Sequence, residues 1–194
     1  MDLCGHATLA TAFVIKNFLS YFINEINFKT LSGNLKVTSS GDFFTLDFPT
    51  RHPVESDLPK IIKNALNIFP IQVFKSRDYL LIYNNQSDIE NITVDPQILN
   101  QLDLKTGGII VTAKGDSVDF VSRFFTPRAS TFEDPVTGSA HCSLIPYWSK
   151  RLNKNQMKAI QLSKRKGELL CVNNNDRVLI TGKAKIYSKG NIWI

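Results

Sequence analysis

The sequence predicts an α+β fold, and three observations support that prediction. Helical and strand-like apolar patterns both occur along the 194 residues. The strand-like runs come in groups, and turn residues such as Gly33 and Asn34 separate neighbouring runs, which is typical of hairpins. Helices and strands do not alternate regularly, so a doubly wound parallel sheet is not expected.

The first fifty residues predict one helix followed by three strands. Four apolar residues have spacings that allow one helical face: Leu9, Ala12, Phe13 and Phe18. The three strand-like runs cover residues 26–31, 35–38 and 43–48. Pro49 and Pro53 follow these strands, and we expect a boundary between two structural units there.

The rest of the chain predicts further strands and three more helices. A helix is expected after Pro59, with an apolar face through Ile62, Ala65 and Leu66. A short helix is expected at 96–102 and a longer apolar one at 139–152. Strands are expected at 71–74, 79–83, 108–113 and 118–125. After Gly167 the pattern predicts an antiparallel meander, with strands at 169–172, 178–181, 184–187 and 192–194.

Composition limits the class of protein. No apolar run is long enough to span a membrane, and the three cysteines have no paired spacing that would indicate disulfides or a zinc site. A reducing, cytoplasmic location follows from that cysteine usage. The formal charge of +6 comes largely from lysine and arginine between residues 150 and 166, without a nucleic-acid motif. We therefore expect a solvated basic face that also attracts anionic substrates, and no nucleic acid as a partner.

Two helix entrances carry the chemistry. Cys4, Gly5 and His6 precede one apolar helix, and the run 132–141 leads through Gly138 into the other. A helix start presents unpaired backbone N–H groups and the positive end of the helix dipole, which favours a bound anion. Two such starts facing one cleft would hold a small carboxylate beside acid/base groups.

The polar residues at these entrances could serve either structure or chemistry. Asp134 precedes a proline and is therefore held in extended geometry, where it either points into a cleft or caps the turn. Thr137 and Ser139 are N-cap candidates. His6 is the best general acid/base by residue type, or a histidine that simply hydrogen-bonds near the helix end.

Two other catalytic arrangements use residues of the same segments. Asp134, Ser139 and His141 lie too close together along one turn for their side chains to form a nucleophilic triad. Cys4 is either a reactive thiolate at a helix start or a small buried apolar residue.

Both entrances resemble the signature segments of a known enzyme family. The sequences L-C-G-H-A-T-L-A at 3–10 and E-D-P-V-T-G-S-A-H at 133–141 are similar to the two motifs of the PhzF-type (phenazine biosynthesis) isomerases. Residues 108–113, 119–125, 143–148, 161–169 and 177–180 are also similar to that family. The resemblance covers essentially the whole chain.

The resemblance implies a diaminopimelate-epimerase-like fold, in which two α+β halves each wrap a curved sheet around a central helix. Residues 1–52 would be a remnant of the N-terminal half-domain and 53–194 the C-terminal half-domain, with the last strands able to pack back on the first half. The implied activity moves a proton between carbons of an unsaturated cyclic acid, without a metal or organic cofactor. The implied assisting residues are His6, Asp134 and Ser139. The implied substrate-binding residues are Gly5, Ala7, Thr137 and Gly138.

The sequence departs from the family at its start. The family's proton-moving glutamate belongs to a segment resembling S-E-T-A-F ahead of the first motif, and no glutamate here matches it. Glu133 is the nearest substitute. We therefore expect a truncated or mis-started member that is weak or inactive alone; a degenerate fragment, or completion by a second polypeptide, are the other accounts.

Two rival functions remain open at this stage. The chain is either a non-catalytic binding protein on the same fold or an epimerase or racemase that uses Cys4. Because the second entrance offers Thr137 instead of a thiol, a two-thiol epimerase is disfavoured. The physiological substrate is not determined by sequence, and homodimer formation through unpaired strand edges is left open.

Overall fold

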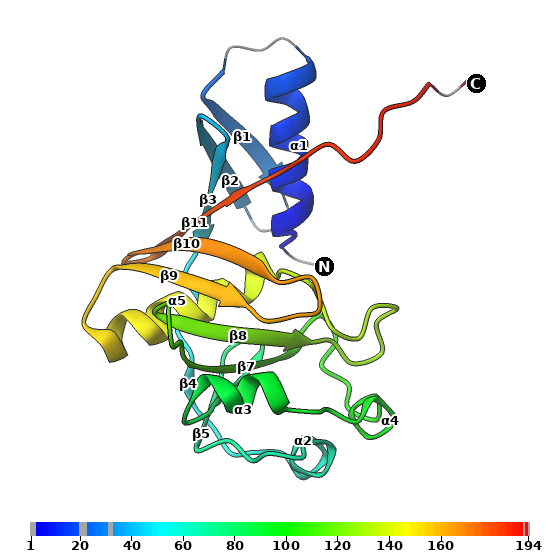
Figure 1. Cartoon of the computed structure of the whole chain (residues 1–194), viewed down its shortest axis with the longest axis vertical. Helices are drawn as coiled ribbons and strands as arrows, with labels where there is room; N and C mark the ends of the chain where they lie inside the picture. The colour runs from blue at the N-terminus through cyan, green and yellow to red at the C-terminus, as the bar shows by residue number, and fades with distance from the viewer. Residues whose placement is uncertain (1–2, 20–22, 31–32, 192, 194) are drawn as a thin grey trace.

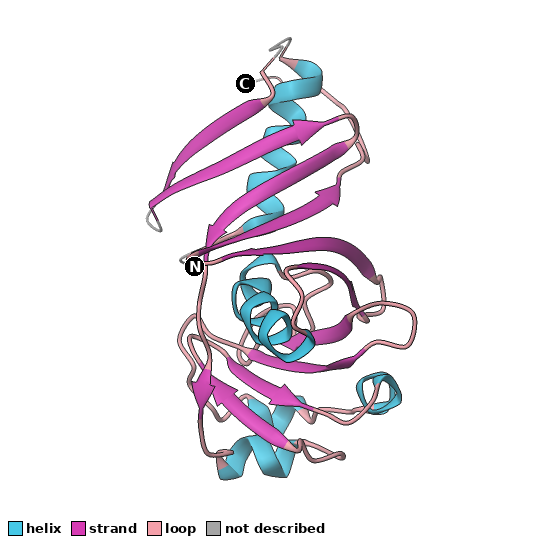
Figure 2. Cartoon of the chain, turned by 90° about the vertical axis from the view of Figure 1, so that its left-hand side faces the viewer, coloured by secondary structure: helices cyan, strands magenta, loops and turns pink. Residues whose placement is uncertain are grey.

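The strands of the protein form one long, curved sheet that wraps two helices in turn (Figure 1). The computed structural model describes residues 3–19, 23–30, 33–191 and 193. Across these residues eleven strands pair in the order β1-β2-β3-β11-β10-β9-β8-β7-β6-β5-β4. Helix α1 covers one end of the sheet, and α5 lies inside the curve of the other part (Figure 2).

The N-terminal part is a helix packed on a three-stranded meander. It consists of α1 (Gly5–Phe18), β1 (Glu25–Thr30), β2 (Gly33–Ser40) and β3 (Phe43–Pro49). Every second residue along most of β2 and β3 is buried, because alternate side chains of a strand point to the same face. The buried set faces α1, where the rings of Phe13 and Phe44 meet edge to face at 5.8 Å.

A strand from the end of the chain extends this meander. β11 (Arg177–Lys183) pairs antiparallel with the whole of β3, from Arg177 opposite Pro49 to Lys183 opposite Phe43. β10 (Gly167–Asn174) continues the sheet on the other side of β11. The two parts of the sheet are therefore joined by backbone hydrogen bonds as well as by the chain connection.

The larger part holds the remaining elements. They are β4 (Val54–Glu55), α2 (Lys60–Ala65), β5 (Gln72–Lys75), β6 (Tyr79–Ile82), α3 (Gln86–Asn91), α4 (Pro96–Leu99), β7 (Ile109–Lys114), β8 (Phe120–Phe125), α5 (Gly138–Leu152) and β9 (Gln156–Gln161). β6 pairs parallel with β7, and β8 with β9, whereas the other pairs are antiparallel. All four residues of β6 are buried, because helices cover both faces of this part of the sheet.

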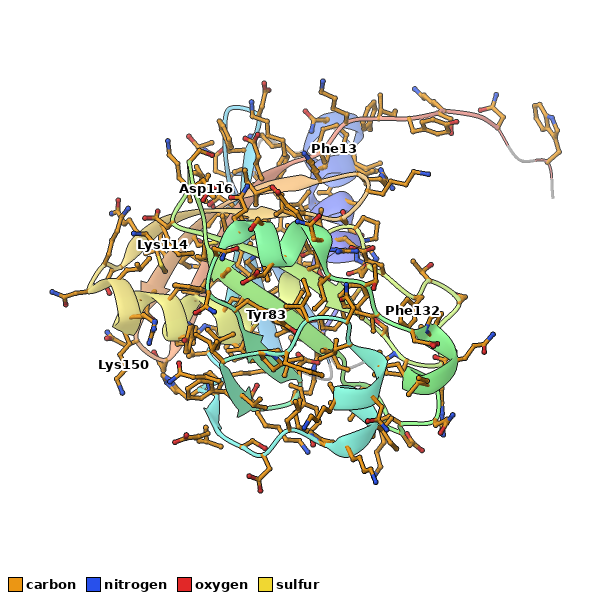
Figure 3. The ribbon with its side chains drawn as sticks, turned by 60° about the horizontal axis from the view of Figure 1, so that its bottom comes forward. Phe13, Tyr83, Lys114, Asp116, Phe132 and Lys150 are labelled. Carbon is orange, nitrogen blue, oxygen red and sulfur yellow. The ribbon has the colours of Figure 1, made fainter. Side chains whose placement is uncertain are left out.

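Two hydrophobic cores lie on opposite faces of the sheet. One contains residues of α1, α5 and the strands around them, including Phe48 and Trp148. The other lies under α2, α3 and α4; it contains Tyr83, and the partly buried Phe132 packs against it (both labelled in Figure 3). Helix α5 is buried almost throughout, whereas on α1 only Gly5 and Ala12 among the described residues are buried.

Pro146 lies inside α5 without breaking it. A proline has no N–H to donate to the carbonyl four residues earlier, which here is that of Cys142. The Cys142 carbonyl instead accepts the backbone N–H of Arg51 at 2.9 Å. The helix ends at Asn153, whose left-handed backbone (φ 51°) is a conformation that asparagine tolerates.

The predicted α+β class is confirmed, and most predicted elements are present. The expected strand at 184–187 is wrong: this segment leaves the sheet after β11 and runs past α1, with Tyr187 fully exposed (Figure 1). The segment alternates apolar and polar residues, but no strand in the described part of the chain pairs with it. Three residues of the predicted strands 26–31 and 192–194 lie outside the described residues: Leu31, Ile192 and Ile194.

Three elements were missed by the sequence patterns. They are β4, β9 and α3. Helix α3 had a local signal, because Asn85 and Asp88 form a reciprocal capping box at its start. β9 alternates buried and exposed residues, but lysine and glutamine occupy its exposed positions and weaken the apolar signal.

The basic cluster predicted from composition lies on the surface. All seven basic residues between 150 and 166 are exposed, as a solvated basic face requires: Lys150, Arg151, Lys154, Lys158, Lys164, Arg165 and Lys166. Lys150 projects outward from α5 (Figure 3). No helix in the described part of the chain is long and apolar enough to cross a membrane.

Candidate functional site

The N-termini of α1 and α5, distant in sequence, lie against each other. A Cβ atom added to Gly5 would lie 3.1 Å from the Cα atom of Gly138, and one added to Gly138 would lie 3.2 Å from the Cα atom of Gly5. The ring of Phe48 stands beside both, at 3.4 and 3.5 Å. Glycine therefore suits both positions, because a side chain at either would crowd the facing backbone, and the two predicted helix entrances lie side by side.

Both helix starts are free of side-chain caps. Within the described residues, neither Cys4 nor Thr137, the two N-cap residues, makes a side-chain cap hydrogen bond, and neither first turn contains an acidic residue. The first-turn N–H groups therefore keep their positive potential. Two positive helix ends in contact favour a negatively charged group between or beside them.

The first entrance is the more open of the two. Cys4 is partly buried, and its Sγ atom lies 3.7 Å from Nε2 of His6. His6 and Ala7 are exposed. The hydroxyl of Thr8 donates back to the Cys4 carbonyl at 2.8 Å, which ties the first turn to its cap residue. A ligand can therefore reach the imidazole of His6.

The second entrance is held by a network of polar contacts. The Thr137 hydroxyl donates to Oδ2 of Asp134, while the Thr137 backbone N–H donates to Oε1 of Gln161 at 2.8 Å. Nε2 of Gln161 donates to the Asp134 carbonyl at 2.7 Å. The carboxylate of Asp134 is therefore held within its own turn by the hydroxyl of Thr137, as the capping alternative predicted, and its role in a cleft stays a prediction.

Ser139 belongs to a buried ion pair that the sequence did not predict. Nη2 of Arg77 donates to the Ser139 hydroxyl at 2.9 Å and to Oδ2 of Asp78 at 2.8 Å. Asp78 is fully buried and also accepts the N–H of Gly108. Burial raises the pKa of Asp78, and Arg77 and the Gly108 N–H oppose this rise. The serine is thus oriented by a guanidinium that is itself fixed by a carboxylate.

His141 is a neutral core residue. It is fully buried, and its Nδ1 atom lies 2.8 Å from the Thr137 carbonyl, which can only accept, so Nδ1 carries the proton. Nε2 has no hydrogen-bond partner among the described residues. Burial lowers the pKa of His141 to about 4. Ser139 contacts Arg77 and His141 contacts the Thr137 carbonyl, so these two side chains do not make the serine–histidine hydrogen bond of a nucleophilic triad.

Glu133 is already occupied by another side chain. Arg123 binds both of its carboxylate oxygens, at 2.7 and 3.0 Å, and also donates to the carbonyls of Ile89 and Ile92. This arrangement anchors the entrance loop to the end of α3. The glutamate nearest to the site in sequence is therefore used for structure.

Sequence reasoning missed the supporting residues Gln161, Arg77, Asp78 and Arg123. In the sequence, each of them is a polar or charged residue next to, or within, an apolar strand pattern. That pattern does not tell which residue the side chain will contact. No group of three or more histidine, cysteine, aspartate or glutamate side chains in the described ranges is arranged to hold a metal ion.

Known proteins provide an independent comparison. The family model described as "Phenazine biosynthesis-like protein" (PhzC-PhzF) matches residues 1–190. An uncharacterised isomerase of Pseudomonas aeruginosa is 42% identical over 194 residues, which are 100% of this chain and 74% of that protein. A human phenazine biosynthesis-like domain-containing protein is 37% identical over 211 residues, with 99% and 73% covered.

Solved structures give the same picture. A PhzF family protein of Enterococcus faecalis superposes with a TM-score of 0.93 at 44% identity, covering 100% of this chain and 74% of that one. A hydroxyproline epimerase of Agrobacterium vitis has a TM-score of 0.55 at 10% identity, covering 95% and 64%, so it shares the fold alone. The diaminopimelate-epimerase-like fold that the sequence predicted is thereby confirmed.

Proposed function

This chain belongs to the phenazine biosynthesis-like (PhzC-PhzF) isomerase family, and on that premise we propose that its site transfers a proton on a small anionic carbon acid. The observation that carries the proposal is the contact of two uncapped helix starts at Gly5 and Gly138. Backbone N–H groups from both helices would bind the carboxylate of the substrate. General acid/base groups at the same two entrances would then act on the neighbouring carbon.

The proposed roles follow the two entrances. His6 takes up or releases the proton at the exposed first entrance, since imidazole suits proton transfer near neutral pH. Asp134 and Ser139 assist from the second entrance, where Thr137 and Arg77 orient them. The main chain at Gly5 and Gly138 holds the substrate, and Ala7 and Thr137 are the neighbouring substrate-binding residues.

We further propose that the 194-residue chain by itself turns over slowly. Glu133 is the nearest substitute for the family's glutamate, but both of its carboxylate oxygens accept hydrogen bonds from Arg123. A cytoplasmic location and a homodimer remain sequence-based expectations.

The binding site is tested with benzoate, an unreactive cyclic carboxylate, followed by amide NMR of the purified chain. Benzoate should shift the N–H signals of Gly5 and Gly138 in a saturable way, whereas neutral benzamide should not. Absence of saturable shifts at both glycines would contradict the site.

The chemistry is tested with 2,5-cyclohexadiene-1-carboxylate in D₂O, whose doubly allylic C–H is a reactive carbon acid. Slow deuterium incorporation that Asp134→Asn abolishes would support the proposed transfer. Turnover as fast as that of the longer Enterococcus faecalis relative would contradict the proposed weakness of this chain. Benzoate protection against heating with no deuterium uptake would instead indicate the rival function, a binding protein.

A Cys4-dependent epimerase is the second candidate, and the 3.7 Å contact between Cys4 Sγ and His6 Nε2 favours it. A neighbouring imidazole can activate a thiol at a helix start. The same D₂O assay separates the candidates: loss of exchange in Cys4→Ala would support the thiol mechanism, and unchanged exchange would dismiss it.

A further inference from the structure

Gln161 is a fully buried polar residue to which the proposed chemistry gives no role. It ends β9, where it stands opposite Ser122 of β8, and its side chain reaches the loop that leads into α5. A buried amide is stable in such a place only if its hydrogen-bonding groups are satisfied. The partners of Gln161 therefore indicate what the residue does.

The hydrogen bonds of this side-chain amide go to two residues of the site. Oε1 accepts the backbone N–H of Thr137 at 2.8 Å. Nε2 donates to the carbonyl of Asp134 at 2.7 Å and to the hydroxyl of Thr137 at 3.2 Å. Gln161 thus holds the loop on both sides of Pro135 and Val136.

The contacts also fix the direction of a hydroxyl group. Because Oγ1 of Thr137 accepts a hydrogen bond from Gln161, its own proton is free for Oδ2 of Asp134. The result is a directed chain from the Gln161 amide through the Thr137 hydroxyl to the Asp134 carboxylate. Hydrogen bonds in such a chain polarise and strengthen one another.

Neighbouring contacts hold the same loop by other means. The N–H of Asp134 donates to the Phe124 carbonyl at 3.0 Å, and the Ser163 hydroxyl donates to the Pro135 carbonyl at 2.8 Å. Val136 packs on Gly167, where an added Cβ would lie 2.2 Å from a methyl carbon of the valine. We therefore expect the loop to keep its path without Gln161, while the Thr137 hydroxyl would lose its donor.

We propose that Gln161 is a positioning residue that directs the Thr137 hydroxyl onto the Asp134 carboxylate. This inference rests on the proposed function, because it assigns Asp134 a part in proton transfer. Gln161 itself touches no reacting atom. It keeps the carboxylate in one orientation beside the two helix starts.

The test compares three variants of the 194-residue chain. Gln161→Met removes all three contacts, and Gln161→Glu keeps an acceptor for the Thr137 N–H while it removes the donor. Ser163→Ala is the matched control, because it removes one neighbouring contact of the same loop and leaves the directed chain intact. Gln161→Glu preserves the size of the side chain and serves if Gln161→Met does not fold.

The first measurement is independent of catalysis. In the unmodified chain and in Ser163→Ala, the Thr137 hydroxyl proton should exchange slowly enough with water to be observed by NMR, with a correlation to the Asp134 carboxyl carbon. Both Gln161 variants should lose that signal. Its persistence in both variants, or its equal loss in Ser163→Ala, would overturn the proposal.

The second measurement separates positioning from binding. Deuterium uptake by 2,5-cyclohexadiene-1-carboxylate should fall about tenfold in both Gln161 variants, while the Kd for benzoate changes less than about threefold. A parallel fall in benzoate affinity would show a general collapse of the site and would contradict the proposal. If the unmodified chain shows no uptake, the proposed function fails, and the hydroxyl signal still decides the role of Gln161.

Discussion

The two helix starts share a sequence pattern and differ in nearly everything that supports them. At the start of α1, Cys4 is partly buried, His6 is exposed, and the Thr8 hydroxyl supplies the local side-chain contact. At the start of α5, Thr137 and Ser139 are buried, and Gln161 and Arg77 hold them from other elements. An apolar run after glycine is enough to begin a helix, but it does not decide how rigid that beginning is.

The difference follows from the layers around each helix. Helix α5 is surrounded by the curved sheet, whereas α1 lies on a single sheet face and exposes Val14 and Phe18 (Figure 2). Segments with few buried apolar contacts open first. We therefore expect the α1 entrance to adapt to a ligand and the α5 entrance to act as the fixed template. Four predictions, from the largest expected effect to the smallest, break or sharpen this comparison.

Removal of the buried carboxylate behind the second start should have the largest effect. Asp78→Ala takes away the partner of both Arg77 and the Gly108 N–H, and breaking a buried pair of this kind costs about 3–5 kcal/mol. The free energy of unfolding in urea measures the loss. Asp47→Ala, which breaks a partly exposed pair with Arg177, is the control and should cost about 1 kcal/mol or less.

His141 should make the stability of the α5 region depend on pH. Its pKa is about 4 in the folded chain, against an ordinary value of 6.5 in the unfolded chain, so the unfolded chain takes up the proton first as pH falls. The contribution of neutral His141 to the free energy of unfolding is complete above about pH 6.5. It is lost progressively towards pH 4, by up to about 3 kcal/mol.

Unfolding in urea at several pH values measures this slope. His141→Gln should flatten it, whereas His52→Gln, at an exposed histidine, should leave it unchanged. A slope of the same size in His141→Gln would contradict the assignment.

The contact between the two starts is tested by adding one methyl group. Gly5→Ala or Gly138→Ala places a Cβ as close as 3.1–3.2 Å to the facing Cα, and we expect a loss of about 1–3 kcal/mol for either. Since both changes force the same two backbones apart, the double variant should cost less than the sum.

Gly182→Ala is the matched control for this pair. It also faces α1, but its added Cβ would meet Leu9 at an ordinary 3.7 Å. Its free energy of unfolding should change by no more than about 0.5 kcal/mol. Equal losses at all three glycines would show that the close approach is unimportant.

Two threonines provide the finest comparison. Thr137→Val removes a hydroxyl that joins Asp134 and Gln161 and should cost about 1 kcal/mol. Thr8→Val removes a hydroxyl that bonds to the Cys4 carbonyl at the open entrance, and about 0.5 kcal/mol or less is expected. A reversed order in thermal unfolding would contradict the contrast between the two starts.

The sequence by itself determined the elements whose signals are local. The helix starts, the meander of β1 to β3 and the α+β class follow from glycines, turn residues and apolar periodicity, because a few neighbouring residues decide them. The motifs around Gly5 and Gly138 were also sufficient to identify the family.

Only the tertiary structure decided which residues meet. Three contacts between separate elements show this: Gly5 lies against Gly138, Gln161 hydrogen-bonds to Thr137, and Arg123 forms an ion pair with Glu133. Local patterns give the direction and burial of a side chain but not its partner. The partner is set by the order and curvature of the strands, and these are properties of the whole sheet.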